Sequence, residues 1–169
     1  EIAKTNNFIQ LVQIATSEDY TTKQWEHSFN NFFKINEHIR LPWNYNYICT
    51  GIVTECITRF NSYTRPWKIP IIVEEEGSIH GIEKVVNILI KSEDVRKDRL
   101  TMIVSCFINF ICNDLVDIVT YNVFPINHKT GWIEMVDQSS TLYEVKNKYD
   151  STLQNYILDF NPHNTVGNI

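Results

Sequence analysis

Apolar and polar residues alternate along the first forty positions at the spacing of amphipathic helices. The pattern predicts a short helix over residues 7–16 and a second helix that begins after Thr21-Thr22. One face of the second helix is aromatic, with Trp25, Phe29, Phe32 and Phe33. A face of this kind packs on a sheet in most folds, so we expect both helices to do so. Leu41-Pro42 ends the helical part, because proline disfavours helix in the residue before it.

The middle of the chain carries short apolar runs rich in β-branched residues, which are typical of strands. Strands are predicted over residues 47–53, 57–60, 67–73, 85–90, 118–123 and 131–136. A helix that Ser92 or Asp94 can cap follows the fourth run. Its broad apolar face consists of Leu100, Ile103, Val104, Phe107, Ile108 and Ile111. Further helices are expected over 141–149 and around 153–158, and Glu74-Glu75-Glu76-Gly77 is expected to be a solvated loop. The pattern predicts an α+β fold in which a mostly antiparallel sheet of about five strands is packed with helices on one side.

Composition narrows the class of protein. The chain of 169 residues is 43% hydrophobic and 12% aromatic, which is typical of a globular domain with a real core. Its net charge of −5 argues against a broad nucleic-acid surface. The four cysteines form no close pair and the five histidines are scattered, so we expect no metal site, no disulfide framework and a reducing compartment. No signal peptide is visible, and no apolar run approaches the roughly 20 residues that span a bilayer. Because the first residue is Glu rather than Met, we expect an excerpt of a longer product.

Two charged residues flank the junction between the fourth strand and its helix. Lys91 stands where the strand leaves the core, and Asp98 lies in the first or second helical turn. The two can meet as an ion pair that holds the lysine ready for a phosphate. A solvated turn is the alternative, and spacing alone favours it. Upstream, the polar turn Asn61-Ser62-Tyr63-Thr64 could offer N–H groups and the Ser62 hydroxyl to phosphates, although any hairpin could carry such a turn.

Four blocks resemble one enzyme family. Lys91-Ser-Glu-Asp-Val-Arg-Lys-Asp98-Arg-Leu-Thr resembles the phosphoinositide 3-kinase and 4-kinase signature, a lysine and short spacer followed by Asp-Leu-Arg-Gln-Asp and Leu-Thr. Tyr121 is similar to the family's strand tyrosine, and Gly131-Trp-Ile-Glu134-Met-Val136 resembles its hinge, Gly-Leu-Ile-Glu-Val-Val. Phe60-Asn61-Ser62-Tyr63-Thr64-Arg65-Pro66-Trp67 resembles its phosphate-side hairpin. The blocks keep the family order within residues 41–145. They depart from it in a spacer after Lys91 that is one residue short and in Lys97, which replaces glutamine.

The resemblance implies a protein-kinase-like N-lobe. Residues 1–40 would be a helical segment leading into the kinase domain, and residues 41–169 would hold the ATP-binding lobe, the hinge and the start of the C-lobe. Two residues are implied to be catalytic, Lys91 by holding the phosphates and Asp98 by positioning Lys91. The other implied ATP-binding residues are Ser62 over the phosphates, Tyr121 at the back of the pocket, Leu89, Ile133 and Met135 beside adenine, and Glu134 and Val136 bonded to it through their backbones.

The family's catalytic loop, Asp-Arg-His-x-x-Asn, and its later Asp-Phe-Gly are missing from these residues. Asp159-Phe160-Asn161 matches the second only superficially, and we interpret it as coincidence. The ligands for Mg²⁺ are therefore expected downstream, with no metal ligand in this chain.

The expected function is the ATP-binding portion of a phosphatidylinositol 3-kinase-like enzyme, which transfers the γ-phosphate of ATP to an inositol ring hydroxyl. The expected location is cytoplasmic and peripheral to membranes. The implied partners are ATP, a phosphatidylinositol membrane surface reached through the full-length protein and, as a further candidate, a regulatory subunit; no nucleic acid is expected. Three alternatives stay open: a 4-kinase or related protein kinase, a non-catalytic kinase-like scaffold, and an unrelated α+β domain.

Overall fold

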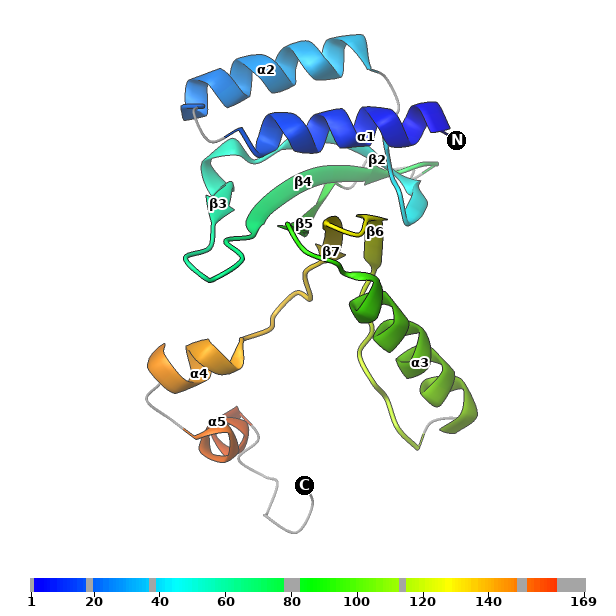
Figure 1. The fold of residues 1–169 in the computed structure, drawn as a ribbon, viewed down its shortest axis with the longest axis vertical. Coiled ribbons are helices and arrows are strands. Elements are labelled where there is room, and N and C mark those ends of the chain that lie inside the picture. The colour runs from blue at the N-terminus through cyan, green and yellow to red at the C-terminus, as the bar shows by residue number, and fades with distance from the viewer. Residues whose placement is uncertain are drawn as a thin grey trace. The chain divides into compact units, whose positions relative to one another are not determined.

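The computed structural model describes residues 2–17, 20–36, 39–77, 83–112, 115–148 and 152–160. The chain divides into two compact units, residues 1–135 and residues 136–169. The first unit holds, in chain order, α1 (Ile2–Ala15), α2 (Thr22–Ile35), β1 (Arg40–Leu41), β2 (Asn44–Ile52), the short 3₁₀ helix η1 (Thr54–Cys56), β3 (Thr58–Arg59), β4 (Trp67–Glu75), β5 (Glu83–Lys91), α3 (Arg96–Cys112), β6 (Val123–Asn127) and β7 (Thr130–Glu134) (Figure 1). The second unit holds α4 (Leu142–Lys148) and α5 (Leu153–Phe160).

The sheet of the first unit is antiparallel throughout its described pairings. Its strand order is β1-β2-β4-β5-β7-β6, and β3 pairs with the beginning of β4. The longest ladder joins β4 to β5 from Trp67 opposite Ile90 to Glu74 opposite Glu83. The α+β class and the antiparallel sheet are confirmed. The sheet has seven strands rather than about five, because β1 and β3 add pairings of two residues each.

Helices α1 and α2 cover one face of this sheet, as their apolar pattern predicted (Figure 1). Phe8 and Leu11 of α1 are fully buried, and they share one core with Ile71 and Ile88 of the sheet. Thr21 begins α2 with a capping box, in which its N–H donates to the side-chain oxygen of Gln24 over 2.8 Å. The N-terminal helical segment is therefore part of the same compact unit as the sheet, and the division of the chain lies after Met135.

An aromatic cluster ties α1 to the far end of the sheet. Trp132 of β7 is 2% exposed, and its ring lies 4.8 Å from that of Phe8 and 5.5 Å from that of Phe124, nearly parallel to the latter. Aromatic rings bury large apolar areas and add a geometric preference of their own. The side chain of Trp132 thus points toward the helices and belongs to the core.

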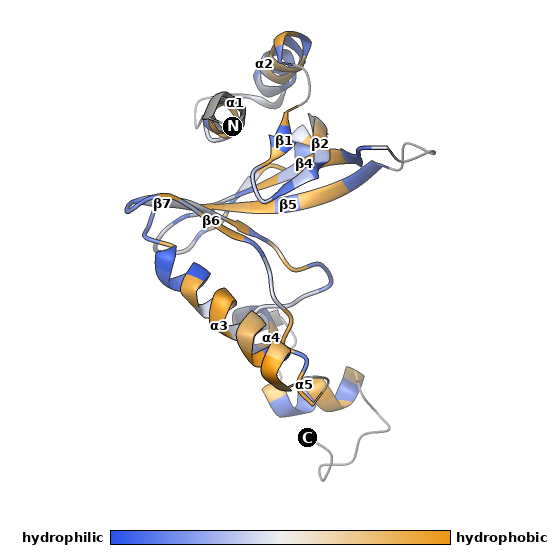
Figure 2. Ribbon diagram, turned by 90° about the vertical axis from the view of Figure 1, so that its right-hand side faces the viewer, coloured by the Kyte–Doolittle hydropathy of each residue, from blue (hydrophilic) through white to orange (hydrophobic). Residues whose placement is uncertain are grey.

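The third helix does not lie where its apolar face predicted. Figures 1 and 2 show α3 projecting from the side of the sheet opposite α1 and α2, so the helices do not all lie on one side. In α3, all of whose residues are described, Ser105 alone is buried. The six apolar residues expected to form its packing face are 37% to 61% exposed: Leu100, Ile103, Val104, Phe107, Ile108 and Ile111.

The strand predicted over residues 118–123 is also wrong. Asn109 of α3 accepts a hydrogen bond from the Ile118 N–H (2.9 Å) and donates one to the Ile118 carbonyl (2.7 Å). Since one side chain satisfies both backbone groups, this stretch runs beside α3 without joining a ladder. The strand begins instead at Val123 and contains Pro125, which lacks an N–H and is tolerated because β6 is an edge strand with a partner on one side alone among the described strands.

A close approach fixes the start of α3 against β7. Val95 precedes α3 and is fully buried, and a Cβ placed on Gly131 would lie 1.9 Å from its Cγ2 atom. No side chain larger than hydrogen fits there without a shift of one element. Glycine is therefore required at this position of β7 by packing.

We expect Gly131→Ala to destabilise the protein by about 1–3 kcal/mol, because the new methyl group overpacks the contact with Val95. Urea unfolding of the parent and the variant measures the difference. Gly51→Ala is the matched control, since its Cβ would meet only the flexible end of Ile72 at 3.3 Å and should cost less. Equal losses in the two variants would show that the contact with Val95 has no special weight.

Candidate functional site

Three of the residues that the sequence singled out lie on the face of the sheet opposite α1 and α2 (the open face), part of which Val95 at the start of α3 covers. Val86, Ile88 and Ile90 of β5 point into the core beneath α1 and α2. Leu89 lies between Ile88 and Ile90, and Lys91 follows Ile90. Both side chains therefore project to the opposite face, since successive side chains of a strand alternate. Leu89 lies opposite Ile133 of β7, and Lys91 lies opposite Gly131. Paired residues share a face, so the register brings Leu89, Lys91 and Ile133 together there.

Lys91 is the last residue of β5, as predicted, but its partner is not the one expected. Its Nζ lies 2.8 Å from Oε1 of Glu93, in a pair whose side chains are 24% and 39% exposed. No ion pair or hydrogen bond joins Lys91 to Asp98 within the described residues. Asp98 does lie in the first turn of α3. The expected Lys91–Asp98 pair is thus absent, because a glutamate two residues along the same turn reaches the lysine first.

The turn between β5 and α3 is organised by Asp94. Its carboxylate accepts the N–H of Arg96, the first residue of α3, over 3.1 Å, while Val95, between the two, accepts the first helical N–H, that of Arg99, at its carbonyl. The Arg96 guanidinium donates three further hydrogen bonds to the Asp94 carboxylate, over 2.5 Å, 2.8 Å and 3.1 Å. The hydrogen bonds from Arg96 lower the pKa of Asp94 to about 2. A carboxylate with this pKa is fully charged near neutral pH.

Glu134, Met135 and Val136 of the expected hinge make different contacts. Glu134 lies opposite Ile88, so its side chain belongs to the face of α1 and α2, where Oε2 accepts hydrogen bonds from the amide and backbone N–H of Asn122, over 2.5 Å and 3.3 Å. The Met135 N–H donates to the carbonyl of Asn87 over 2.9 Å, which lengthens the contact between β7 and β5. Val136 is exposed and begins the second unit.

Ser62 and Tyr121 lie away from the three residues on the open face. Ser62 is exposed at the tip of the β3–β4 connection, where its carbonyl accepts the N–H of Arg65 over 3.1 Å. Tyr121 precedes β6 and lines a cavity beside α3. The β3–β4 connection does end where β4 faces β5, so Ser62 lies at the same end of these strands as Lys91.

Register reveals one basic residue that the sequence patterns did not single out. Lys68 of β4 lies opposite Leu89, so it shares the open face with Lys91. Such a diagonal neighbour is typically about 7–8 Å away. A lone lysine inside an apolar strand carries no signal by itself, and only the pairing of β4 with β5 places it here.

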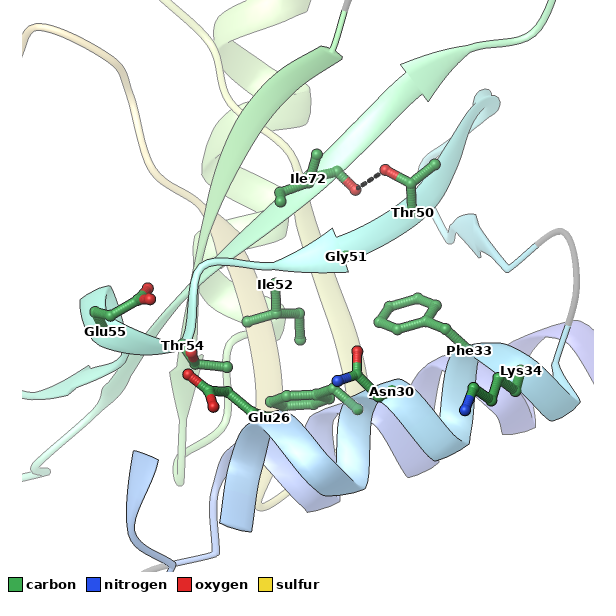
Figure 3. A pocket seen from close by; sticks show the side chains of 11 residues that line it. Glu26, Asn30, Phe33, Lys34, Thr50, Gly51, Ile52, Thr54, Glu55 and Ile72 are labelled. Carbon is green, nitrogen blue, oxygen red and sulfur yellow. Dashed lines mark hydrogen bonds between the residues drawn. The ribbon is translucent and has the colours of Figure 1, made fainter. Parts of the chain in front are cut away.

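Three cavities in the described part of the chain lie away from this face. The largest of three, of about 500 Å³, lies between α2 and β2, where Asn30 and Phe33 rise toward Thr50, Gly51 and Ile52 (Figure 3). A second, of about 430 Å³, lies between α1 and the β5–β7 end of the sheet. The third, also of about 430 Å³, lies beside α3 and includes Tyr121. None of the three is lined by Leu89, Lys91 or Ile133.

The described part of the chain shows neither a metal site nor a membrane-spanning helix. It holds no group of three or more His, Cys, Asp or Glu residues that could bind a metal ion. None of its helices has both the length and the apolar character needed to cross a bilayer. A scan against models of protein families and a search of curated proteins each found no match to this chain.

The low pKa of Asp94 predicts a pH-dependent stability. A carboxylate whose folded pKa lies below its unfolded value near 4 stabilises the fold above that value, and the contribution is lost as the pH falls toward 2. The melting temperature of the parent should therefore exceed that of Asp94→Asn above pH 4, and the difference should shrink between pH 4 and pH 2. The double variant Asp94→Asn/Arg96→Gln should follow the profile of Asp94→Asn. Parallel melting profiles of parent and single variant through this range would contradict the assignment.

Proposed function

We propose that this chain is the ATP-binding portion of a phosphatidylinositol 3-kinase-like lipid kinase. The observation that carries the proposal is the register that sets Leu89, Lys91 and Ile133 on one open face of the sheet. The order of elements adds support, since a hairpin, a strand ending in lysine, a helix and a second hairpin follow one another as the sequence resemblance implies. Three of the four resembling blocks fall on a turn, a strand end or a helix start of this order, and the fourth, Tyr121, precedes β6.

In this proposal the open face binds ATP, which supplies the γ-phosphoryl group. Leu89, which is partly exposed, would offer an apolar surface for adenine, and Met135 would extend it just past the end of β7; Ile133 is 8% exposed and would lie beneath them. Lys91 would exchange Glu93 for the phosphates, because a phosphate carries more negative charge than one carboxylate. Lys68 would add a second cation on the same face. Glu134 and Val136 would bond adenine through their backbone, Ser62 would approach the phosphates and Tyr121 would stand behind the pocket.

Asp98 needs a different account from the one the resemblance implies. Its position in the first turn of α3 places it near the junction, but Glu93 now holds Lys91. We propose that Asp98 takes over Lys91 when nucleotide draws the lysine away from Glu93. In this proposal the magnesium ligands and the group that orients the inositol hydroxyl would come from other residues of the full-length protein.

The proposal is tested on the natural full-length protein with labelled ATP, Mg²⁺ and phosphatidylinositol vesicles. Lys91→Ala should lower turnover by about 100-fold or more, because it removes a positioned donor to the transferred charge. Lys84→Ala is the matched control, since Lys84 is exposed near the other end of β5 and should leave turnover unchanged. Turnover of Lys91→Ala within about threefold of the parent would overturn the assignment. Phosphate transfer to a peptide in place of lipid would identify a related protein kinase.

One observation favours a second candidate, a non-catalytic kinase-like scaffold. Lys91 is already neutralised by Glu93, and the three cavities lie elsewhere. A scaffold would bind no ATP, whereas the enzyme would bind ATP with an affinity that Lys91→Ala weakens. Calorimetric titration of the full-length protein with Mg²⁺–ATP separates the two.

A further inference from the structure

A cavity of about 430 Å³ lies between α3, the β1–β2 turn and the approach to β6. Its lining is largely apolar and aromatic on one side and carries hydroxyl, thiol and amide groups on the other. The residues are Pro42, Trp43, Arg99, Met102, Ile103, Cys106, Thr120, Tyr121, Asn122, Val123 and Phe124. Tyr121, which the proposed function assigns to the back of the nucleotide pocket, is one of these residues; the other ten have no part in that proposal.

Arg99 is the one charged residue of this lining. Its guanidinium makes no ion pair or hydrogen bond to any other residue that the structure describes, in contrast to Arg96 in the same turn, which binds Asp94. An arginine presents five N–H donors in a planar fork that matches a carboxylate. The lining therefore offers one exposed guanidinium without an acidic partner among the described residues, in the same cavity as the rings of Trp43, Tyr121 and Phe124.

The exposed apolar face of α3 is continuous with this cavity. Residues three and four apart are neighbours on a helix, so Arg99 adjoins Ile103, and Ile103 adjoins Phe107. Ile103 lines the cavity and is 55% exposed, and the face continues through Leu100, Val104, Phe107 and Ile111, which are 48% to 61% exposed. Figure 2 shows that α3 changes from hydrophilic at its start, in blue, to mostly hydrophobic further along, in orange. A contiguous apolar surface of this extent marks an interaction site.

We propose that the cavity and the apolar face of α3 together form a docking groove for a partner polypeptide segment. The segment is apolar along one side and carries an acidic residue that binds Arg99. This inference goes beyond the proposed kinase function and does not depend on it.

Charge and shape select this occupant over two others. The only acidic residue within α3 is Asp98, in its first turn, so a second copy that paired through the apolar face would bring no carboxylate along that face. A bilayer surface could cover the apolar face, but it is flat and would leave the concave lining between Trp43 and Cys106 unfilled. A peptide side chain can enter such a cavity while its neighbours lie along the helix.

The test uses two fluorescein-labelled peptides of about a dozen residues, with Leu and Phe at helical spacing along one face. One carries a single Glu beside that face, and the other has Gln in its place. We expect the Glu peptide to bind the 169-residue chain about tenfold more tightly than the Gln peptide, as a charge-assisted hydrogen bond implies. Fluorescence anisotropy measures both affinities.

Three variants separate the parts of the groove. Arg99→Gln should abolish the difference between the two peptides. Lys97→Gln, the matched control, removes the same charge from the same helical turn outside the cavity lining and should preserve the difference. Ile103→Ser should weaken the binding of both peptides. Because Ile103 is 55% exposed, this substitution should not unfold the protein. Equal effects of Arg99→Gln and Lys97→Gln would overturn the proposal.

Two other measurements test whether a second copy of the chain or a membrane surface covers this face instead. Sedimentation equilibrium that finds a dimer disrupted by Ile103→Ser would assign the face to a second copy and overturn the proposal. Binding to phosphatidylserine vesicles without saturable binding of the Glu peptide would assign it to a membrane surface and overturn it equally.

Discussion

The contact between Gly131 and Val95 is the constraint on which the rest of the site depends. It leaves no room for a side chain on β7, so the backbone of β7 lies directly against the residue that starts α3. This sets the end of β5 and the beginning of the helix at one place beside β7. Lys91 and the apolar surface of Leu89 and Ile133 are then fixed relative to one another by ladder register rather than by side-chain packing. A strand pairing is a rigid scaffold, and functional side chains gain precision from it.

The same junction explains why the charged turn has two separate ion pairs. Glu93 lies two residues after Lys91 and Asp94 two residues before Arg96, so each acid binds the base nearest to it in the chain. Exposed pairs of this kind contribute little to stability and exchange partners readily. The turn therefore positions Lys91 while leaving it able to exchange Glu93 for another anion. This is compatible both with ATP binding and with a non-catalytic scaffold.

Periodicity in the sequence was sufficient for the elements whose two faces differ. Helical spacing predicted α1 and α2, and the apolar, β-branched run over residues 85–90 predicted β5 and the exit of Lys91, where burial alternates through Val86, Ile88 and Ile90. It failed where the deciding interaction is not periodic. Residues 118–123 look like a strand, but the Asn109 side chain takes both backbone groups of Ile118. Lys68 was missed for a related reason, since its place on the open face follows from pairing with Leu89, a contact between distant positions.

The apolar residues of α3 carry a different lesson about what a helical pattern means. A broad apolar face predicts that something covers it, but it does not say that the cover is the helix's own sheet. Here the sheet side of α3 is taken by Ser105 and by Asn109, which binds the following loop, so the large residues are left outward. Because the polar residues of α3 face the sheet and its large apolar residues face outward, we expect its apolar face to pack against a surface other than this sheet. The guanidinium of Arg99 lies at the edge of that surface and has no partner among the described residues. A partner that covers the apolar face of α3 would therefore be complementary to it if it carried a negative charge.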